Sequence, residues 1–311
     1  MYIVLKEDTF FKLGKKIDGS RIKSDEMMAG HTTFRVGGPV SCFIEVCDTP
    51  ELLYCLKVLR ENDERFFLLG NGSNLLVHDE GYEGCILKLS GSFSDITIKP
   101  AEDPGYYVVS AGAAASLINV SIKSANEALT GLEFASGIPG TVGGAMVMNA
   151  GAYGGEMKDV VKTVTLLDIN TGDICTRTAE EMGFGYRDSI IRHNDLIVLR
   201  ADFLLKKGDR DSIWEKIEEL KEKRVSKQPL EYPSAGSTFK RPEGYFAGKL
   251  IEDSGLKGYS VGGACVSEKH CGFVINKGGA TAADIITLIG DVQRIVKEKQ
   301  GVMLEPEVII L

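Results

Sequence analysis

The sequence lacks the features that would place the chain in a membrane, in a secreted class or around a metal ion. Its longest uncharged run is rich in glycine, which is not the composition of a membrane helix. The N-terminal stretch MYIVLKEDTFFKLGKK contains no long apolar core of the kind found in signal peptides. The seven cysteines form no Cys-x-x-Cys pair, and the four histidines show no metal-ligand spacing. We therefore expect a cytoplasmic protein with reduced thiols and no metal.

An excess of basic residues is also missing. The 311-residue chain carries 36 Lys and Arg against 44 Asp and Glu, which gives a formal net charge of −8. A nucleic-acid surface requires a basic stripe, and the lysines and arginines here are scattered among acids. An anionic small ligand is still possible, because local amides and a few basic groups can outweigh a distant net charge. We expect no nucleic-acid partner and no membrane partner.

The order of apolar and turn residues predicts a mixed α and β fold. The pattern predicts, in chain order, helices at 49–63 and 116–129, a β-meander at 160–207, helices at 208–229 and 281–301, and a closing strand at 306–311. Thr49 is the expected N-cap of the first of these helices. The last helix begins with a Thr281–Asp284 capping box and ends at Gly301. The charged helix at 208–229 has the place of a connector into a final α/β unit.

Two glycine-rich stretches are the strongest local signals. Residues 68–77, LLGNGSNLLV, predict a strand and a glycine turn whose successive backbone N–H groups can bind a phosphate. The dinucleotide fingerprint G-x-G-x-x-G fails there because Leu75 occupies the third glycine position, so a plain β-turn is the alternative. Residues 137–156, GIPGTVGGAMVMNAGAYGGE, contain seven glycines and no charge before Glu156. This segment indicates either tight internal packing or a surface where main-chain amides meet a ligand.

Six short blocks in one order resemble the UDP-N-acetylenolpyruvoylglucosamine reductases, flavoenzymes of bacterial cell-wall precursor synthesis. The blocks are TTFRVGGP, LGNGSNLLV, GIPGTVGGAMVMNAGAYGGE, FGYRDS, PSAGSTFKRP and LEPEV. The resemblance spans residues 32–308, which is nearly the whole chain. The compact connection from RTAEEMGFGYRDS to DLIVLRADF, with no extra tyrosine-bearing loop before the connector helix, is similar to the shorter, second subtype of the family.

The resemblance implies an α+β chain with the two-subdomain FAD-binding fold of the vanillyl-alcohol-oxidase type and a C-terminal α/β substrate-binding domain. We expect the FAD-binding region at 1–207, divided near residue 98, and the substrate-binding domain at 208–300. A C-terminal strand at 301–311 is expected to return to the active site. The implied reaction uses NADPH and non-covalently bound FAD to reduce UDP-N-acetylglucosamine enolpyruvate to UDP-N-acetylmuramate. We expect a monomer.

Three polar residues are the catalytic candidates by resemblance. Ser237 is implied as the proton donor, although a turn serine by default bonds its own backbone. Arg187, otherwise a surface arginine, is implied to face the substrate carboxyl. Glu307, otherwise a solvated strand residue, is implied to stabilise the charge that develops there. Glu305 would point the same way along a strand, so spacing alone leaves both acids open, and the family pattern favours Glu307.

The glycine stretches and the TTFRVGGP block supply the expected cofactor contacts, because bare backbone can approach an isoalloxazine ring and a pyrophosphate. Close strand packing is the alternative. The implied residues are Arg35, Gly70, Asn71, Gly72, Ser73, Asn74, Leu75, Gly137, Ile138, Pro139, Gly140, Gly143, Gly144, Ala145, Asn149 and Gly151. Four side chains are candidates for substrate binding and equally for unrelated surface or core positions: Lys240, Arg241, Arg224 and His270. Arg241 stands where longer members of the family carry Asn.

Two other functions remain open from the residues. An FAD oxidase or dehydrogenase for a hydroxy acid or alcohol would share the fold, but many such enzymes tether flavin through His or Cys, and residues 137–156 contain neither. A nucleotide-sensing module would bind with the glycine loops alone, and Arg187, Ser237 and Glu307 would be dispensable. NADPH oxidation that depends on the enolpyruvyl sugar nucleotide separates both from the reductase.

Overall fold

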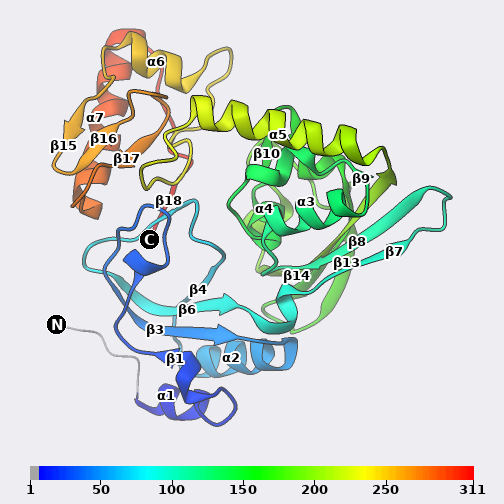
Figure 1. The fold of residues 1–311 in the computed structure, drawn as a ribbon. Helices are drawn as coiled ribbons and strands as arrows, with labels where there is room; N and C mark the ends of the chain where they lie inside the picture. Colours follow the sequence, from blue (N-terminus) through cyan, green and yellow to red (C-terminus); the bar gives the residue numbers. More distant parts are fainter. Residues whose placement is uncertain (1–6) are drawn as a thin grey trace.

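The computed structural model describes residues 7–311, and its N-terminal unit is built on a mostly parallel sheet (Figure 1). The strands are β1 (Ile22–Lys23), β2 (Glu26–Met27), β3 (Pro39–Val46), β4 (Phe66–Leu69) and β6 (Tyr82–Leu89). Strands β3, β6 and β4 pair in parallel in that order, while β1 and β2 pair antiparallel with β3. Two helices, α1 (Glu7–Leu13) and α2 (Thr49–Glu61), lie against each other beside this sheet.

The second unit is an antiparallel sheet. Its strands are β7 (Ile96–Pro100), β8 (Tyr106–Gly112), β9 (Leu129–Thr130), β12 (Val161–Asp168), β13 (Ile174–Thr178) and β14 (Leu196–Lys207). The order is β13-β12-β14-β8-β7, with β9 paired to β14. The predicted meander is therefore wrong in one respect: β14 pairs with β12 instead of β13, because the long connection at 179–195 carries the chain to the other edge of β12. The predicted division near residue 98 falls inside β7.

Short helices and a hairpin pack beside the second sheet. They are α3 (Leu117–Asn126), α4 (Val142–Val147), β10 (Gly151–Ala152) and β11 (Gly155–Glu156). One apolar core runs through both units, and it joins Ile44 and Leu52 of the first to Val109 and Phe203 of the second. The two units are thus held together by continuous burial of apolar surface.

The connector helix α5 (Arg210–Lys227) leads from the second unit into the C-terminal unit, as predicted. Ile213 and Ile217 of α5 pack on Ala125 of α3, so the helix lies on the second unit. The C-terminal unit has a three-stranded antiparallel sheet and two helices, and its apolar core also includes Phe34, Val36 and Leu76 of the first unit. These elements are α6 (Ala247–Asp253), β15 (Ser260–Val261), β16 (Ala264–Val266), β17 (Val274–Asn276) and α7 (Ala282–Gln300).

Helix ends follow the capping chemistry of the sequence. The predicted capping box at the start of α7 is confirmed, since the Thr281 hydroxyl and the Asp284 carboxylate accept each other's backbone N–H. Gly301 ends this helix in the left-handed conformation, with φ 71°. The expected N-cap Thr49 is one residue off: Asp48 caps α2, because its carboxylate can accept an N–H of the first turn.

The end of the chain ties the C-terminal unit to the first unit. Strand β18 (Ile309–Ile310) pairs in parallel with β5 (Leu75–Leu76), directly after the glycine turn at 70–74. The Asp79 carboxylate accepts hydrogen bonds from the first two N–H groups of α7, at 2.8 and 2.9 Å. The chain end consequently lies between these two units (Figure 1). Within residues 7–311, no helix is both long and apolar enough to cross a lipid bilayer.

Candidate active site

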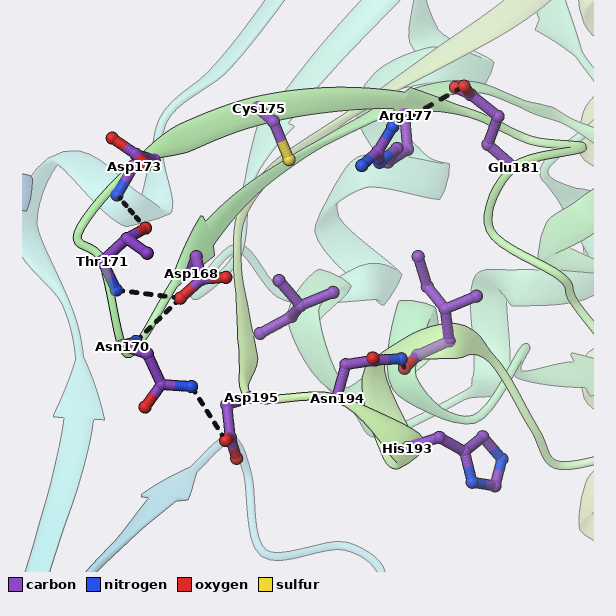
Figure 2. A pocket seen from close by; sticks show the side chains of 12 residues that line it. Asp168, Asn170, Thr171, Asp173, Cys175, Arg177, Glu181, His193, Asn194 and Asp195 are labelled. Carbon is purple, nitrogen blue, oxygen red and sulfur yellow. Dashed lines mark hydrogen bonds and ion pairs between the residues drawn. The ribbon is translucent and has the colours of Figure 1, made fainter.

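Two cavities lie in different parts of the molecule. The larger, about 780 Å³, is at the β12–β13 turn, where Asp168, Asn170 and Asp195 lie close together (Figure 2). The smaller, about 430 Å³, lies between the second unit and the C-terminal unit. All three predicted catalytic residues line the smaller cavity: Arg187, Ser237 and Glu307. Because only this cavity gathers those residues from separate segments, we take it as the candidate site.

Arg187 lies in a tight turn that aims its side chain across the cavity. Gly185 and Asp188 bridge the turn, and Arg187 itself adopts φ 56°, an unusual conformation for a residue with a side chain. Its Nε donates to Glu307 Oε1 at 2.5 Å. The guanidinium also lies 5.4 Å from the ring centre of Tyr186. The structure therefore presents a fixed cation whose partner comes from the end of the chain.

Glu307 is the buried acid of the site. Its side chain is 11% exposed, and its backbone N–H donates to the Thr238 carbonyl at 2.8 Å. Burial raises the pKa of this carboxyl above its usual range, and the neighbouring Arg187 opposes the rise. A carboxyl with this environment can hold a proton or accept hydrogen bonds from Arg187.

Glu305 does not share the direction of Glu307, contrary to the strand expectation. Its side chain is 68% exposed and forms an ion pair with Lys240. The reason is local: only Pro306 makes a bridge in this stretch, the chain bends at Val308, and β18 starts later than the predicted strand. The twofold alternation of a strand therefore does not apply between residues 305 and 307.

Ser237 exposes its hydroxyl toward the cavity, as predicted. The residue is exposed, and its hydroxyl makes no hydrogen bond to any group within residues 7–311. Its neighbour Thr238 holds the turn in place: the Thr238 N–H donates to the Gly272 carbonyl at 2.8 Å, and its Oγ1 accepts from the Val274 N–H at 3.0 Å. The default interpretation of a turn serine that bonds its own backbone does not hold here.

The four candidate substrate-binding side chains fall into two groups. Arg241 and His270 line the cavity, whereas Lys240 and Arg224 lie outside its lining. Arg241 stacks on Phe246, with 3.9 Å from the guanidinium to the ring centre. Nδ1 of His270 accepts from the Gly272 N–H at 3.1 Å, so the neutral ring carries its proton on Nε2. Burial lowers the pKa of His270, which favours this neutral form.

Arg224 packs against the first glycine of the 137–156 segment. A Cβ at Gly137 would lie 2.8 Å from Arg224 Nη1, so the absence of a side chain there makes room for the guanidinium. Burial lowers the pKa of Arg224. Within residues 7–311, the guanidinium has no hydrogen-bond or ion-pair partner. A partly desolvated cation of this kind is suited to an anionic ligand.

The two glycine stretches meet, as the sequence predicted. Asn71 Nδ2 donates to the Pro139 carbonyl at 2.9 Å, and a Cβ at Gly140 would lie 3.8 Å from Ser73 Oγ. The four successive N–H groups at residues 71–74, and those of Gly140 and Thr141, donate to no acceptor within residues 7–311. Successive free amides of this kind form an anion-binding nest. The loops can therefore hold a phosphate or pyrophosphate.

Other glycines of the 137–156 segment serve packing. A Cβ at Gly143 would lie 3.1 Å from the Ala113 carbonyl oxygen, and the Gly143 N–H donates to that same oxygen at 2.8 Å. Asn149 is buried, and its side chain hydrogen-bonds within the protein. Leu75 is also buried, in β5. The segment therefore combines an open loop around Gly140 with packed positions such as Gly143 and Asn149, whereas Gly154 lies in open space.

Sequence reasoning missed two aromatic residues of the cavity. Tyr186 and Phe246 line it, and both remain strongly exposed. The Tyr186 hydroxyl accepts from the Arg241 N–H at 2.9 Å. Tyr186 directly precedes Arg187 in the sequence. Phe246 lies in the stretch GYFAGKL, which resembles a phosphate-binding loop but does not match its pattern. An aromatic residue next to a candidate catalytic residue was the available signal, and it applied to Tyr186 but not to Phe246.

Comparison with known proteins identifies both parts of the chain. A family model described as "FAD binding domain" matches residues 40–177, and one described as "UDP-N-acetylenolpyruvoylglucosamine reductase, C-terminal domain" matches residues 228–311. A reductase of that name from Lachnoclostridium phytofermentans is 50% identical over 94% of this chain and 93% of its own length. One from Agathobacter rectalis is 52% identical over 91% of this chain and 92% of its own. The crystal structure of the Thermus caldophilus reductase has TM-score 0.79 and 36% identity, and covers 93% of this chain and 98% of its own.

Proposed function

The chain belongs to the family of UDP-N-acetylenolpyruvoylglucosamine reductases, and from this membership we propose how its own residues carry out the reaction of the family. The protein is an FAD-dependent oxidoreductase. It reduces UDP-N-acetylglucosamine enolpyruvate to UDP-N-acetylmuramate with NADPH, in peptidoglycan precursor synthesis.

The free amides of residues 71–74 and 140–141 would hold the pyrophosphate of FAD. This assignment rests on the open cradle between the two loops, which a side chain at Gly140 would begin to fill. Of the other residues expected to contact the cofactor, Leu75, Ala145 and Asn149 are buried and would act only by shaping the two loops, whereas Arg35 is exposed. When bound, FAD supplies the hydride transfer from NADPH to C3 of the enolpyruvyl group. The protein positions FAD and the substrate and supplies the charged groups around them.

Arg187 and Glu307 stabilise the negative charge that develops on the substrate carboxylate. The guanidinium is fixed by the turn at 185–188 and by Glu307, so little reorganisation is needed when the charge appears. Burial raises the pKa of Glu307, and its carboxylate accepts from Arg187 Nε and so orients the guanidinium toward the substrate. Electrostatic donors of this kind are each worth a factor of about 100 to 1000 in rate.

Ser237 gives its proton to C2 of the substrate. The hydroxyl faces the cavity that contains Arg187 and Glu307, and it is free of protein hydrogen bonds within residues 7–311. A serine hydroxyl is a weak acid, so it can act only on a strongly basic carbanion, which this reaction generates beside it. The convergence of Ser237, Arg187 and Glu307 on one cavity is the single observation that supports this mechanism most.

The nucleotide part of the substrate lies toward Arg241 and His270. Arg241 offers a cation next to the exposed ring of Phe246, and His270 offers a neutral Nε2–H donor. Lys240 would have to leave Glu305 to reach the diphosphate, whereas Arg224 is available beside the cofactor cradle. Of the four candidates, Arg241 and His270 are therefore the better placed.

The test separates the two halves of the catalytic cycle. Ser237→Ala should leave reduction of bound FAD by NADPH near normal and slow its reoxidation by the enolpyruvyl substrate. Ser234→Ala is the matched control, because Ser234 lies in the same turn outside the cavity lining. An equal loss in both half-reactions would contradict the role of Ser237.

For the protein as a whole, we propose a cytoplasmic location and a monomeric state. We also propose the division into an FAD-binding region at 1–207, a substrate-binding domain at 208–300 and a returning strand at 301–311. Light scattering on the purified holoenzyme tests the monomer. A mass of two chains at assay concentration would contradict it.

A further inference from the structure

Two buried side chains attach the turn that carries Arg187 to the glycine-rich segment. Asn149 Nδ2 donates to the Gly185 carbonyl at 3.0 Å, at the start of the turn. Ser189 Oγ donates to the Val147 carbonyl at 2.9 Å, at its end. Both anchors therefore connect residues 147–149 with residues 185–189, which are far apart in the sequence.

The side-chain amide of Asn149 makes its hydrogen bonds with other groups of the protein. Its Nδ2 also donates to Glu156 Oε2 at 2.7 Å, and its Oδ1 accepts from the Lys158 N–H at 3.0 Å. The residue is 1% exposed and adopts φ 41°, a left-handed conformation that asparagine tolerates better than most residues. An unusual backbone conformation that is held by buried hydrogen bonds is typical of a functional support.

Ser189 is equally buried, at 1% exposed. Between the two anchors, the Arg187 carbonyl accepts from Arg192 Nη1 at 2.7 Å, and Arg187 itself has φ 56°. The backbone at Arg187 is thus strained and is held from both sides. Without one anchor, the turn can relax and move the guanidinium away from Glu307.

We propose that Asn149 and Ser189 are positioning residues that set the guanidinium of Arg187 for the reductase reaction. The proposal rests on the role of Arg187 in the proposed function. A displacement of about 1 Å in a catalytic group can cost about 100-fold in rate, so loss of one hydrogen bond in this clamp has a measurable effect. Neither side chain needs to touch the cofactor or the substrate.

The first experiment uses Ser189→Ala in the holoenzyme. We expect reoxidation of the reduced enzyme by the enolpyruvyl substrate to slow by about tenfold, and reduction by NADPH to stay within about twofold. The dissociation constant of the substrate for the oxidised enzyme, measured by calorimetry, should rise as well. Ser124→Ala is the control: Ser124 is buried, and its hydroxyl also donates to a backbone carbonyl, at 2.8 Å, but within α3. Equal effects of the two substitutions would overturn the proposal.

The second experiment asks whether Ser189 acts through Arg187. In an Arg187→Ala background, Ser189→Ala should cause no further loss of reoxidation rate or substrate affinity, because the guanidinium is already gone. Additive losses would overturn the proposal. If Arg187→Ala alone left reoxidation unchanged, the assigned role of Arg187 would be wrong. If reoxidation were normal in Ser189→Ala but slow in Arg187→Ala, only the positioning role of Ser189 would be refuted.

Asn149→Gly completes the test, because glycine keeps the left-handed backbone and removes only the amide. We expect FAD to be retained, reduction by NADPH to be near normal, and reoxidation to slow as in Ser189→Ala. Loss of FAD with normal reoxidation after reconstitution would instead make Asn149 a cofactor contact, and would refute its positioning role.

Discussion

Glu307→Gln should make the enzyme slower without making the protein less stable at neutral pH. The carboxyl is 11% exposed, and burial raises its pKa despite the ion pair with Arg187. A raised pKa means that the folded protein binds the proton of Glu307 more tightly than the unfolded chain does. The ionised side chain is therefore a net cost to folding at neutral pH. A carboxamide removes this cost and can still accept from Arg187.

The sign of the pH dependence is set by the same shift. The stabilising contribution of a group with a raised folded pKa is fully present below its unfolded pKa, about 4.3 for glutamate, and is lost as pH rises through the folded pKa. Relative to Glu307→Gln, the wild-type protein should thus lose stability as pH rises from the unfolded to the folded pKa of Glu307. Above the folded pKa, the difference in free energy of unfolding between the two proteins should stay constant. Urea unfolding of the two proteins across this pH range measures the effect.

The rate of reoxidation should fall in Glu307→Gln, although the stability at neutral pH does not. If Glu307 helps to stabilise the developing charge, its loss slows reoxidation by the enolpyruvyl substrate by a factor of about 100 to 1000, or about 2.7–4 kcal/mol. Reduction by NADPH should stay within about twofold. The flavin absorbance follows both half-reactions in stopped flow.

Glu305→Gln is the matched control for this prediction. Glu305 is 68% exposed and pairs with Lys240 outside the cavity lining, so its loss should leave both half-reactions nearly unchanged. The reasoning is refuted if Glu307→Gln lowers both half-reactions equally and also unfolds more easily at neutral pH. That result would make Glu307 a structural residue of the Arg187 ion pair.

Three further predictions test an ion pair of the first unit, the cofactor loop and the start of α7. Glu51→Gln should lower the free energy of unfolding at neutral pH by about 1.5–3 kcal/mol, because Arg21 donates two hydrogen bonds to this carboxylate at 2.7 Å. This contribution is present above the ordinary glutamate pKa and disappears as pH falls through the lowered pKa of Glu51, which urea unfolding at several pH values detects. Gly72→Ala should abolish FAD retention, since its Cβ would lie 2.1 Å from a carbonyl oxygen. Gly105 is also at positive φ but has open space around it, so Gly105→Ala should lower the free energy of unfolding by roughly 1–2 kcal/mol and keep the flavin spectrum. Asp79→Ala should lower the free energy of unfolding by about 0.5–2 kcal/mol, because the first two N–H groups of α7 lose their acceptor although the Thr281 cap remains; an unchanged melting temperature would contradict that role.

The local signals of the sequence predicted the secondary structure well where they were strong. The capping box at Thr281 and the stop at Gly301 were correct because capping depends on residues within one turn. The strands at 160–207 were recognised, but their order was not, because the partner of β14 depends on where a long connection leads. The order of six motif blocks was sufficient to identify the family, and with it the reaction and the cofactor.

Spacing alone could not distinguish Glu307 from Glu305; the family pattern favoured Glu307, and the tertiary structure shows how the two acids differ. Strand alternation put both acids on one side, while the irregular chain around Pro306 turns one toward Arg187 and the other toward Lys240. Sequence spacing also could not show that the Asn149 amide bonds the carbonyl of Gly185.

The sequence by itself determined the kind of fold, the family and the loops that remain bare for a cofactor, because these depend on short-range residue patterns. The tertiary structure decided which charged groups meet in the cavity. Arg187 and Glu307 are 120 residues apart, and their contact exists because β18 pairs with β5 and Asp79 caps α7. Such contacts depend on the packing of whole units against one another, which no local pattern of residues specifies.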